Sequence, residues 1–298
     1  VYRGSAVRLW VSAPGGPVAA LELGEVETAT TGFDAAWDRH ADVPGENEAG
    51  AYLETQAGAK REFLVLSHDF RPRAGTTRWR LAVLGDPVGT PLTLTWDVAA
   101  VEADREIYLQ ELADEQPVGF PVDMRQSAIL EDLSTATFEV CLGAGEAIAL
   151  PVPNGWALLG NPIMSVRSAG EVFGAAPGGP GLPVTRWYWR DGEYRLHGDE
   201  EPLTPEVGYW VHGPAVAHTA VIAGVRADGA IRLQPGWNLV SPAADCAMPE
   251  VVGLDSRAWG WDSGLGCYLA VRPGEWLKAG RGYWLYVTAD HAVQVRLE

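Results

Sequence analysis

The stretch Gly155-Trp156-Ala157-Leu158-Leu159 decides the fold of the second half of the chain, because it returns as Gly236-Trp237-Asn238-Leu239-Val240. Further matches follow each stretch in the same order. They are Trp187-Tyr188-Trp189 with Trp259-Gly260-Trp261, Tyr194 with Tyr268, and Gly208-Tyr209-Trp210-Val211 with Gly282-Tyr283-Trp284-Leu285. Self-similarity at a long fixed spacing marks one supersecondary unit that is used repeatedly. The matched positions hold aromatic residues and glycine, with no recurring acid, base and nucleophile, so the repeat argues against an enzyme.

The repeat divides the chain into three expected domains, which are residues 1–143, a first copy at 146–225 and a second copy at 229–298. Each copy predicts about five short strands followed by a closing strand. Units of about 70–80 residues are marginally stable alone, so the two copies are expected to pack as a pseudo-symmetric pair. The first copy also carries an insertion rich in proline and glycine at 177–183, which we expect to be a surface loop.

Residues 1–143 predict a β domain. Alternation is clear around residues 78–84, where Trp79, Leu81 and Val83 should face one side of a strand. The expected strands are 6–12, 18–23, 62–67, 78–84, 92–97, 106–112 and 137–142. Short strands separated by turn residues favour an immunoglobulin-like antiparallel sandwich. The segment 34–51 is rich in acidic residues and is expected to be a long surface loop.

The composition excludes some partners. The 298 residues carry a formal net charge of −17, which disfavours binding to nucleic acid or to an anionic membrane. No uninterrupted apolar run is long enough to span a bilayer. The chain opens Val1-Tyr2-Arg3-Gly4 without a basic and apolar leader, so we expect a soluble, exported chain in its mature form.

The three cysteines are Cys141, Cys246 and Cys267. The last two lie inside the second copy and have no counterparts in the first, so we expect a disulfide between Cys246 and Cys267. Cys141 is then expected to be buried as a small hydrophobic side chain.

The order GWxLV, then WxW with a nearby Asp and Tyr, then GYW, resembles a repeat of large secreted and cell-surface proteins of bacteria and archaea. Residues 32–38, 122–125 and 137–140 resemble β-sandwich modules that occur beside such repeats. The resemblance implies an extracytoplasmic location and a scaffold or adhesion role, and it brings no agreed active-site residues. The first copy departs from the pattern at Ala157, where the second keeps Asn238.

The tryptophans are the strongest candidates for ligand contact, since Trp rings stack on sugar faces as readily as they fill cores. Both copies retain Trp at the matched positions, so we interpret those rings as structural core. The unmatched Trp276, Trp10 and Trp37 are the expected ligand contacts on the surface.

Metal binding and catalysis have weaker signals. Asp34, Asp38 and Asp42 are candidate calcium ligands, but their spacing is wider than that of a DxDxDG loop. Calcium is therefore the only cofactor that we consider.

The run Ser67-His68-Asp69 holds the residue types of a serine triad, yet strand neighbours point to opposite faces, so His68 should not bridge the other two. The motifs GxSxG and HExxH do not occur.

These observations favour a non-enzymatic extracellular structural or adhesion protein that associates with itself or with other surface proteins. Strands at 6–11 and 292–297 could add to the sheet of another subunit in a filament or layer, although it is simpler that they complete their own sheets. The alternative is a carbohydrate-binding module that uses exposed tryptophans. A third option is a secreted hydrolase whose carboxylates lie on separate loops.

Overall fold

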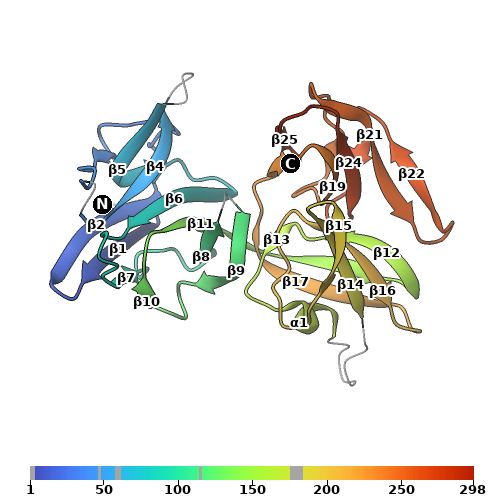
Figure 1. The fold of residues 1–298 in the computed structure, drawn as a ribbon, viewed down its shortest axis with the longest axis horizontal. Coiled ribbons are helices and arrows are strands. Elements are labelled where there is room, and N and C mark those ends of the chain that lie inside the picture. Colours follow the sequence, from blue (N-terminus) through green and yellow to red (C-terminus); the bar gives the residue numbers. More distant parts are fainter. Residues whose placement is uncertain (1–3, 46–47, 58–61, 114–115, 175–183) are drawn as a thin grey trace. The chain divides into compact units, whose positions relative to one another are not determined.

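The computed structural model describes residues 4–45, 48–57, 62–113, 116–174 and 184–298, and these are almost all in β-strands or their connections (Figure 1). The expected loop at 177–183 lies outside the described residues. The chain divides into unit 1, Val1–Ala144, and unit 2, Gly145–Glu298.

Unit 1 is built from strands that pair mostly in antiparallel fashion. They are β1 (Ala6–Ala13), β2 (Gly16–Glu25), β3 (Arg39–His40), β4 (Gly50–Ala57), β5 (Glu62–Arg71), β6 (Thr76–Leu84), β7 (Leu92–Asp97), β8 (Arg105–Ala113), β9 (Gln116–Asp123), β10 (Ile129–Leu133) and the first half of β11 (Ala136–Val152). The sheet path runs β10-β7-β1-β2-β5-β4-β6-β11, and β8 joins β11 to β9. The pair β2 and β5 is parallel.

The seven strands expected in this part are confirmed as β1, β2, β5, β6, β7, β8 and β11. The expected loop at 34–51 is wrong in part, because it contains β3 and the start of β4. The simpler expectation for strand 6–11, that it completes its own sheet, is confirmed for β1, which lies between β2 and β7 and is paired with both.

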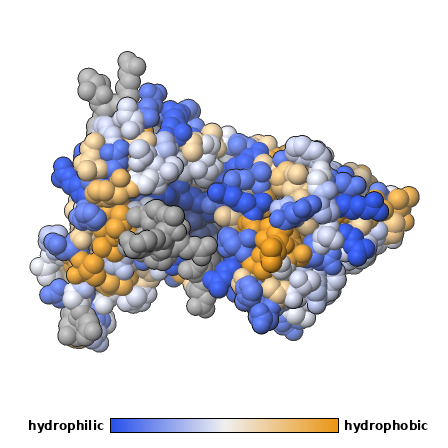
Figure 2. All heavy atoms as spheres, turned by 90° about the horizontal axis from the view of Figure 1, so that it is seen from above, coloured by the Kyte–Doolittle hydropathy of each residue, from blue (hydrophilic) through white to orange (hydrophobic). Residues whose placement is uncertain are grey.

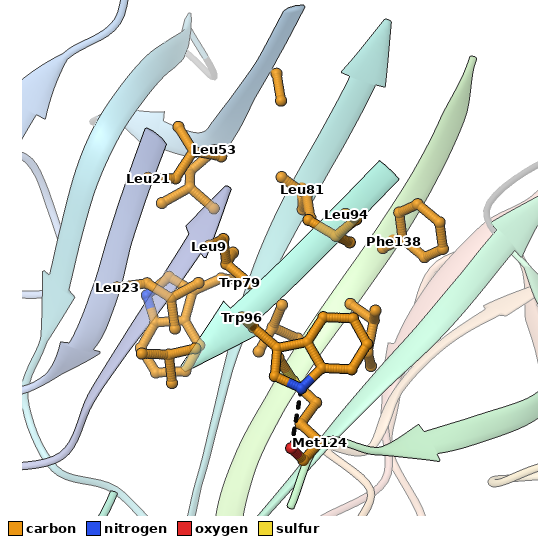
Figure 3. Packing of buried hydrophobic residues seen from close by; sticks show 14 of the residues in the cluster. Leu9, Leu21, Leu23, Leu53, Trp79, Leu81, Leu94, Trp96, Met124 and Phe138 are labelled. Carbon is orange, nitrogen blue, oxygen red and sulfur yellow. Dashed lines mark hydrogen bonds between the residues drawn. The ribbon is translucent and has the colours of Figure 1, made fainter. Parts of the chain in front are cut away.

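Unit 1 has one main core. Trp79, Leu81 and Val83 are buried on it, as the alternation predicts. Figure 3 shows this core, to which Leu9 of β1, Leu94 of β7 and Phe138 of β11 also contribute. The indole of Trp96 is held in place because its Nε1 donates a hydrogen bond to the Met124 carbonyl at 2.9 Å (Figure 3). Strands from both ends of the sheet path therefore enclose the same core.

A buried ion pair lies at one side of this core. Arg105 Nη2 is 2.5 Å from Glu25 Oε1, and both side chains are almost fully buried. Thr77 also donates its hydroxyl to Glu25, and Arg105 donates to the Ala74 carbonyl. The two charges thus have fixed partners in a region that excludes water.

Unit 2 consists of the second half of β11, one short helix and the remaining strands. These are β12 (Gly155–Gly160), β13 (Ile163–Met164), α1 (Ala169–Phe173), β14 (Thr185–Arg190), β15 (Glu193–His197), β16 (Gly208–Gly213), β17 (His218–Arg226), β18 (Ala230–Leu233), β19 (Gly236–Val240), β20 (Cys246–Ala247), β21 (Leu254–Asp262), β22 (Cys267–Val271), β23 (Trp276–Leu277), β24 (Tyr283–Val287) and β25 (Val293–Arg296). The strands expected from both copies are confirmed. The helix α1 was not expected, and it begins with a capping box between Ser168 and Glu171.

The two copies place their strands in the same order. The first has a four-stranded sheet β12-β16-β14-β15 and the second has β19-β24-β21-β22 (Figure 1). Strands β11 and β17 pair in the first copy, as β18 and β25 do in the second. Each copy has its own hydrophobic cluster, which includes Tyr209 and Val211 in the first and Tyr283 and Leu285 in the second.

The surface is strongly hydrophilic over much of the face that Figure 2 shows, in keeping with the acidic composition. Hydrophobic patches, shown in orange, interrupt it. Trp and Tyr are close to neutral on this hydropathy scale, so an aromatic surface is not coloured orange. None of the helices in the described part of the chain is long and apolar enough to cross a membrane.

Candidate functional site

The candidate site is an aromatic surface in unit 2, and strand alternation produces it. In β12 the side chains of Ala157 and Leu159 enter the core of the first copy, so Trp156 and Leu158 face the other way. In β16, Tyr209 and Val211 enter the same core, which leaves Trp210 on the outer face. The matched residues of β19 and β24 alternate in the same sense. Each copy therefore has one aliphatic face and one aromatic face.

A buried tyrosine fixes the inner side of each aromatic sheet. The Tyr209 hydroxyl accepts a hydrogen bond from the Thr204 amide at 2.8 Å. The Tyr283 hydroxyl accepts one from the Lys278 amide at 2.9 Å. Burial raises the pKa of both phenols, so both stay neutral hydrogen-bonding groups at physiological pH. The recurring tyrosine of the GYW motif is thus an anchor and not a ligand contact.

The glycine of the same motif lets the two copies approach closely. A Cβ atom on Gly208 would lie 2.9 Å from the Leu239 side chain of the other copy. A Cβ atom on Gly282 would lie 2.8 Å from the Leu159 carbonyl oxygen. Real Cβ contacts are not this short, so a larger residue at Gly208 would displace the Leu239 side chain, and one at Gly282 would push against the backbone of the first copy.

The outer faces of the two sheets pack against each other. Leu158, Leu239 and Trp284 are buried in this contact, and four further tryptophans are partly buried against them: Trp189, Trp210, Trp259 and Trp261. We call these seven residues the aromatic layer. Edge-to-face contacts dominate it, for example Trp189 with Trp284 at 5.3 Å between ring centroids and Trp210 with Trp261 at 5.1 Å. This geometry is the favourable one for aromatic quadrupoles.

Reciprocal hydrogen bonds join the copies across the layer. Trp189 Nε1 donates to the Trp237 carbonyl at 3.0 Å, and Trp261 Nε1 donates to the Trp156 carbonyl at 3.2 Å. In each bond the second tryptophan of a WxW motif in one copy reaches the GW motif of the other. The two motifs that recur most clearly in the sequence are therefore in contact between copies.

Two open pockets lie where the aromatic layer meets solvent. Pocket A has a volume of about 450 Å³ and is lined by Trp156, Trp187, Tyr194, Trp210 and Trp261. Pocket B has a volume of about 430 Å³ and is lined by Trp189, Tyr194, Trp237, Trp259, Tyr268 and Trp284. Both volumes are in the range of small-ligand sites.

Several pocket rings remain available to a ligand. Trp156 and Trp237 are 45% and 46% exposed, and Tyr194 and Tyr268 are exposed to a similar extent. The pKa of Tyr268 is raised, chiefly by burial of its hydroxyl, and the neighbouring Tyr194 hydroxyl also raises it. The lining is therefore uncharged at neutral pH and can offer ring faces, indole N–H groups and neutral phenol hydroxyls.

The three tryptophans expected to contact ligand are divided between the units, with Trp10 and Trp37 in unit 1 and Trp276 in unit 2. Trp276 is 60% exposed in β23, with Lys278 Nζ 5.5 Å from the centre of its ring. Trp10 is 38% exposed on β1 in unit 1. Trp37 packs against Phe70 with 6.2 Å between ring centroids. None of these three side chains lines pocket A or pocket B.

The expected calcium candidates do not converge among the described residues, where no group of three or more His, Cys, Asp or Glu side chains could hold a metal ion. Asp38 is buried and accepts hydrogen bonds from the backbone amides of Phe70 at 2.8 Å and Asp34 at 2.7 Å. Burial raises the pKa of Asp38 and these two hydrogen bonds oppose the rise. Asp42 is exposed. The Asp38 carboxylate thus links the backbone at Asp34 to the backbone at Phe70.

The expected disulfide is not formed. Cys246 is buried in β20 opposite Leu277, whereas Cys267 is exposed in β22 opposite Asp262. The two strands belong to different sheets, which directs the two thiols to different environments. Cys141 is fully buried, as predicted.

Ser67, His68 and Asp69 do not form a triad. Asp69 pairs with Arg71 at 2.8 Å. Contrary to the expectation from alternation, His68 Nδ1 does lie 3.1 Å from Ser67 Oγ. The Ser67 hydroxyl also lies 3.2 Å from the His40 carbonyl, and when it donates its hydrogen there, Nδ1 can bond to Ser67 only as a donor. A general base would have to accept the serine proton instead.

No protein-family model, no curated protein and no solved structure matches this chain. The geometry of the aromatic surface is therefore the basis for assigning a function.

Proposed function

We propose that the protein is a non-enzymatic adhesion protein of the cell surface or the extracellular space, and that it binds glycans on the aromatic surface of unit 2. The observation that carries this proposal is the pair of open pockets whose described lining consists of Trp and Tyr side chains. Pyranose rings have an apolar C–H face that an indole can cover. The hydroxyl groups of the sugar stay in contact with water when the aromatic surface is open to solvent.

The composition of the pockets supports binding and not catalysis. An acid–base mechanism needs a titrating group at the reacting atom. The described lining contains no carboxylate or imidazole, and its raised pKa makes the Tyr268 phenol a poor proton donor. The sequence resemblance to surface-protein modules agrees with attachment as the role.

We further propose that unit 2 is a pseudo-twofold pair and that unit 1 is an immunoglobulin-like sandwich. The reciprocal indole-to-carbonyl hydrogen bonds support the first assignment. The core of unit 1, enclosed by strands from both ends of one sheet path, supports the second. The parallel pair β2 and β5 is a departure from a purely antiparallel sandwich.

A glycan array followed by fluorescence titration tests the function. We expect the full chain to bind at least one unbranched neutral polysaccharide, with a change in Trp emission. The double variant Trp156→Ala/Trp237→Ala should lose binding, because it removes an exposed ring from each pocket. The control Trp276→Ala removes an exposed ring elsewhere and should bind as the unchanged protein does. Absence of binding across the array, or loss of binding in the control alone, refutes the proposal.

Self-association is a second candidate function. Strands β15 and β22 end their sheets, and they carry the exposed side chains Leu196 (59%) and Leu269 (46%). Exposed apolar end strands can pair with another chain. Light scattering over a wide concentration range and electron microscopy test this. A monomer at all concentrations, with the Leu196→Lys/Leu269→Lys variant behaving identically, removes the candidate.

A further inference from the structure

The two pockets are built from matched residues. Each ring of pocket A has a counterpart in pocket B under the alignment of the two copies: Trp156 with Trp237, Trp187 with Trp259, Tyr194 with Tyr268, Trp210 with Trp284, and Trp261 with Trp189. Their ring contacts also match. Trp156 lies 6.0 Å from Trp210, and Trp237 lies 6.1 Å from Trp284.

Each pocket is assembled from both copies. Besides Tyr194, which the first copy supplies to both pockets, pocket A takes Trp261 from the second copy and pocket B takes Trp189 from the first. These two rings are the ones whose indole N–H groups bond to the opposite copy. The contact that joins the copies therefore also positions the ring that completes each pocket.

The two pockets adjoin each other at Tyr194, which lines both of them. Its ring lies 6.1 Å from Trp284 of pocket B, and its hydroxyl is close enough to that of Tyr268 to raise the Tyr268 pKa. A ligand longer than one pocket can thus pass over Tyr194 from one pocket into the other.

The charge of the site selects against anionic ligands. The described lining side chains are uncharged at neutral pH, and the whole chain has a net charge of −17. An anionic sugar would enter an apolar pocket of an acidic protein without a cationic partner in the lining, which is unfavourable both for desolvation and for long-range electrostatics.

We infer that pockets A and B are two equivalent sites for one uncharged glycan chain, each site being assembled from both copies of the repeat. This inference rests on the proposed glycan binding. Binding of one chain in both pockets makes the second contact intramolecular, so affinity should rise steeply once the chain is long enough to reach across Tyr194.

Calorimetry with the full chain tests the inference. The probes are the disaccharide and the hexasaccharide of the cello-, chito- and manno-oligosaccharide series. For the series that binds, we expect two disaccharides per chain with equal affinity. We expect one hexasaccharide per chain, bound at least tenfold more tightly.

Single-ring variants separate the two sites. Trp156→Ala and Trp237→Ala should each reduce the disaccharide stoichiometry from two to one, and each should bind the hexasaccharide about as weakly as the disaccharide. Tyr194→Ala should weaken the disaccharide at both sites. All three side chains are about half exposed, so unchanged thermal melting should verify the fold. Trp276→Ala is the control and should leave both stoichiometry and affinity unchanged.

The outcomes distinguish the two proposals. If no oligosaccharide in any series binds, the proposed function fails and the inference fails with it. If a disaccharide binds but the hexasaccharide binds no more tightly, or if Trp156→Ala alone abolishes all binding, the glycan function stands and the paired, equivalent sites are refuted.

Discussion

Replacing Trp189 or Trp261 by phenylalanine should destabilise unit 2 by the same amount. Each indole donates one hydrogen bond to the other copy, at 3.0 Å and 3.2 Å respectively. Each also makes one edge-to-face contact with a tryptophan of the other copy, at 5.3 Å and 5.1 Å. Phenylalanine keeps a ring in the aromatic layer but removes the N–H group and part of the apolar surface.

The magnitude follows from those two losses. A lost hydrogen bond costs about 1 kcal/mol. The smaller ring removes roughly 40 Å² of buried apolar area, which at about 25 cal/mol per Å² is about 1 kcal/mol more. Each variant should therefore lose about 2 kcal/mol of unfolding free energy. For a unit of this size, that loss lowers the melting temperature by about 4–8 °C.

Scanning calorimetry of the full chain measures this effect. The transition of unit 2 should shift equally in the two variants, and Trp276→Phe should shift it by less than about 1 °C because that ring is 60% exposed. A large shift in Trp189→Phe with almost none in Trp261→Phe would show that the two contacts are not equivalent. That result would refute the pseudo-twofold pairing on which the two-site inference depends.

Three further predictions concern the rest of the chain. Glu25→Gln should destabilise unit 1 by about 3–5 kcal/mol in urea titrations, because it leaves the buried Arg105 without its counter-charge. In the native chain a thiol reagent such as DTNB should modify Cys267 alone, and the buried Cys141 and Cys246 should react only after denaturation; a protein with one thiol after denaturation would contradict this. Burial lowers the pKa of His68, so the unfolded state binds more protons below about pH 6.5 and unit 1 should lose stability as the pH falls from 7 to 5. His68→Gln should flatten this pH dependence, and an unchanged slope would show that another group titrates.

Much of the strand pattern was predictable from the sequence because alternation and turns are local properties. Trp79, Leu81 and Val83 identify their strand and its buried face without reference to the rest of the chain. The strand β4 was missed because its start lies in a segment whose acidic residues suggest a loop. The pairing of β2 with β5 in parallel depends on contacts far apart in sequence, and a strand pattern alone does not encode them.

The candidate site was not predictable in the same way. The sequence indicates correctly that Trp187 and Trp189 share one face of a strand. Whether that face is buried depends on how much of it the other copy covers, which is a property of the packed pair. Trp284 is covered, whereas Trp237 stays 46% exposed at the margin of the same contact.

The exposed rings at the margin of the contact between the copies change where function is expected in a duplicated fold. Conventional reasoning assigns matched residues to folding and unmatched ones, such as Trp276, Cys246 and Cys267, to function. In unit 2 the five matched tryptophans of the aromatic layer join the two copies and also line the pockets, together with further rings of the same motifs. The contact leaves Trp156 and Trp237 about half exposed at its margin, and the twofold arrangement we propose would make the two margins alike. If the aromatic contact stabilised the duplicated unit, the same contact would also create two similar pockets. No further residue would have to change.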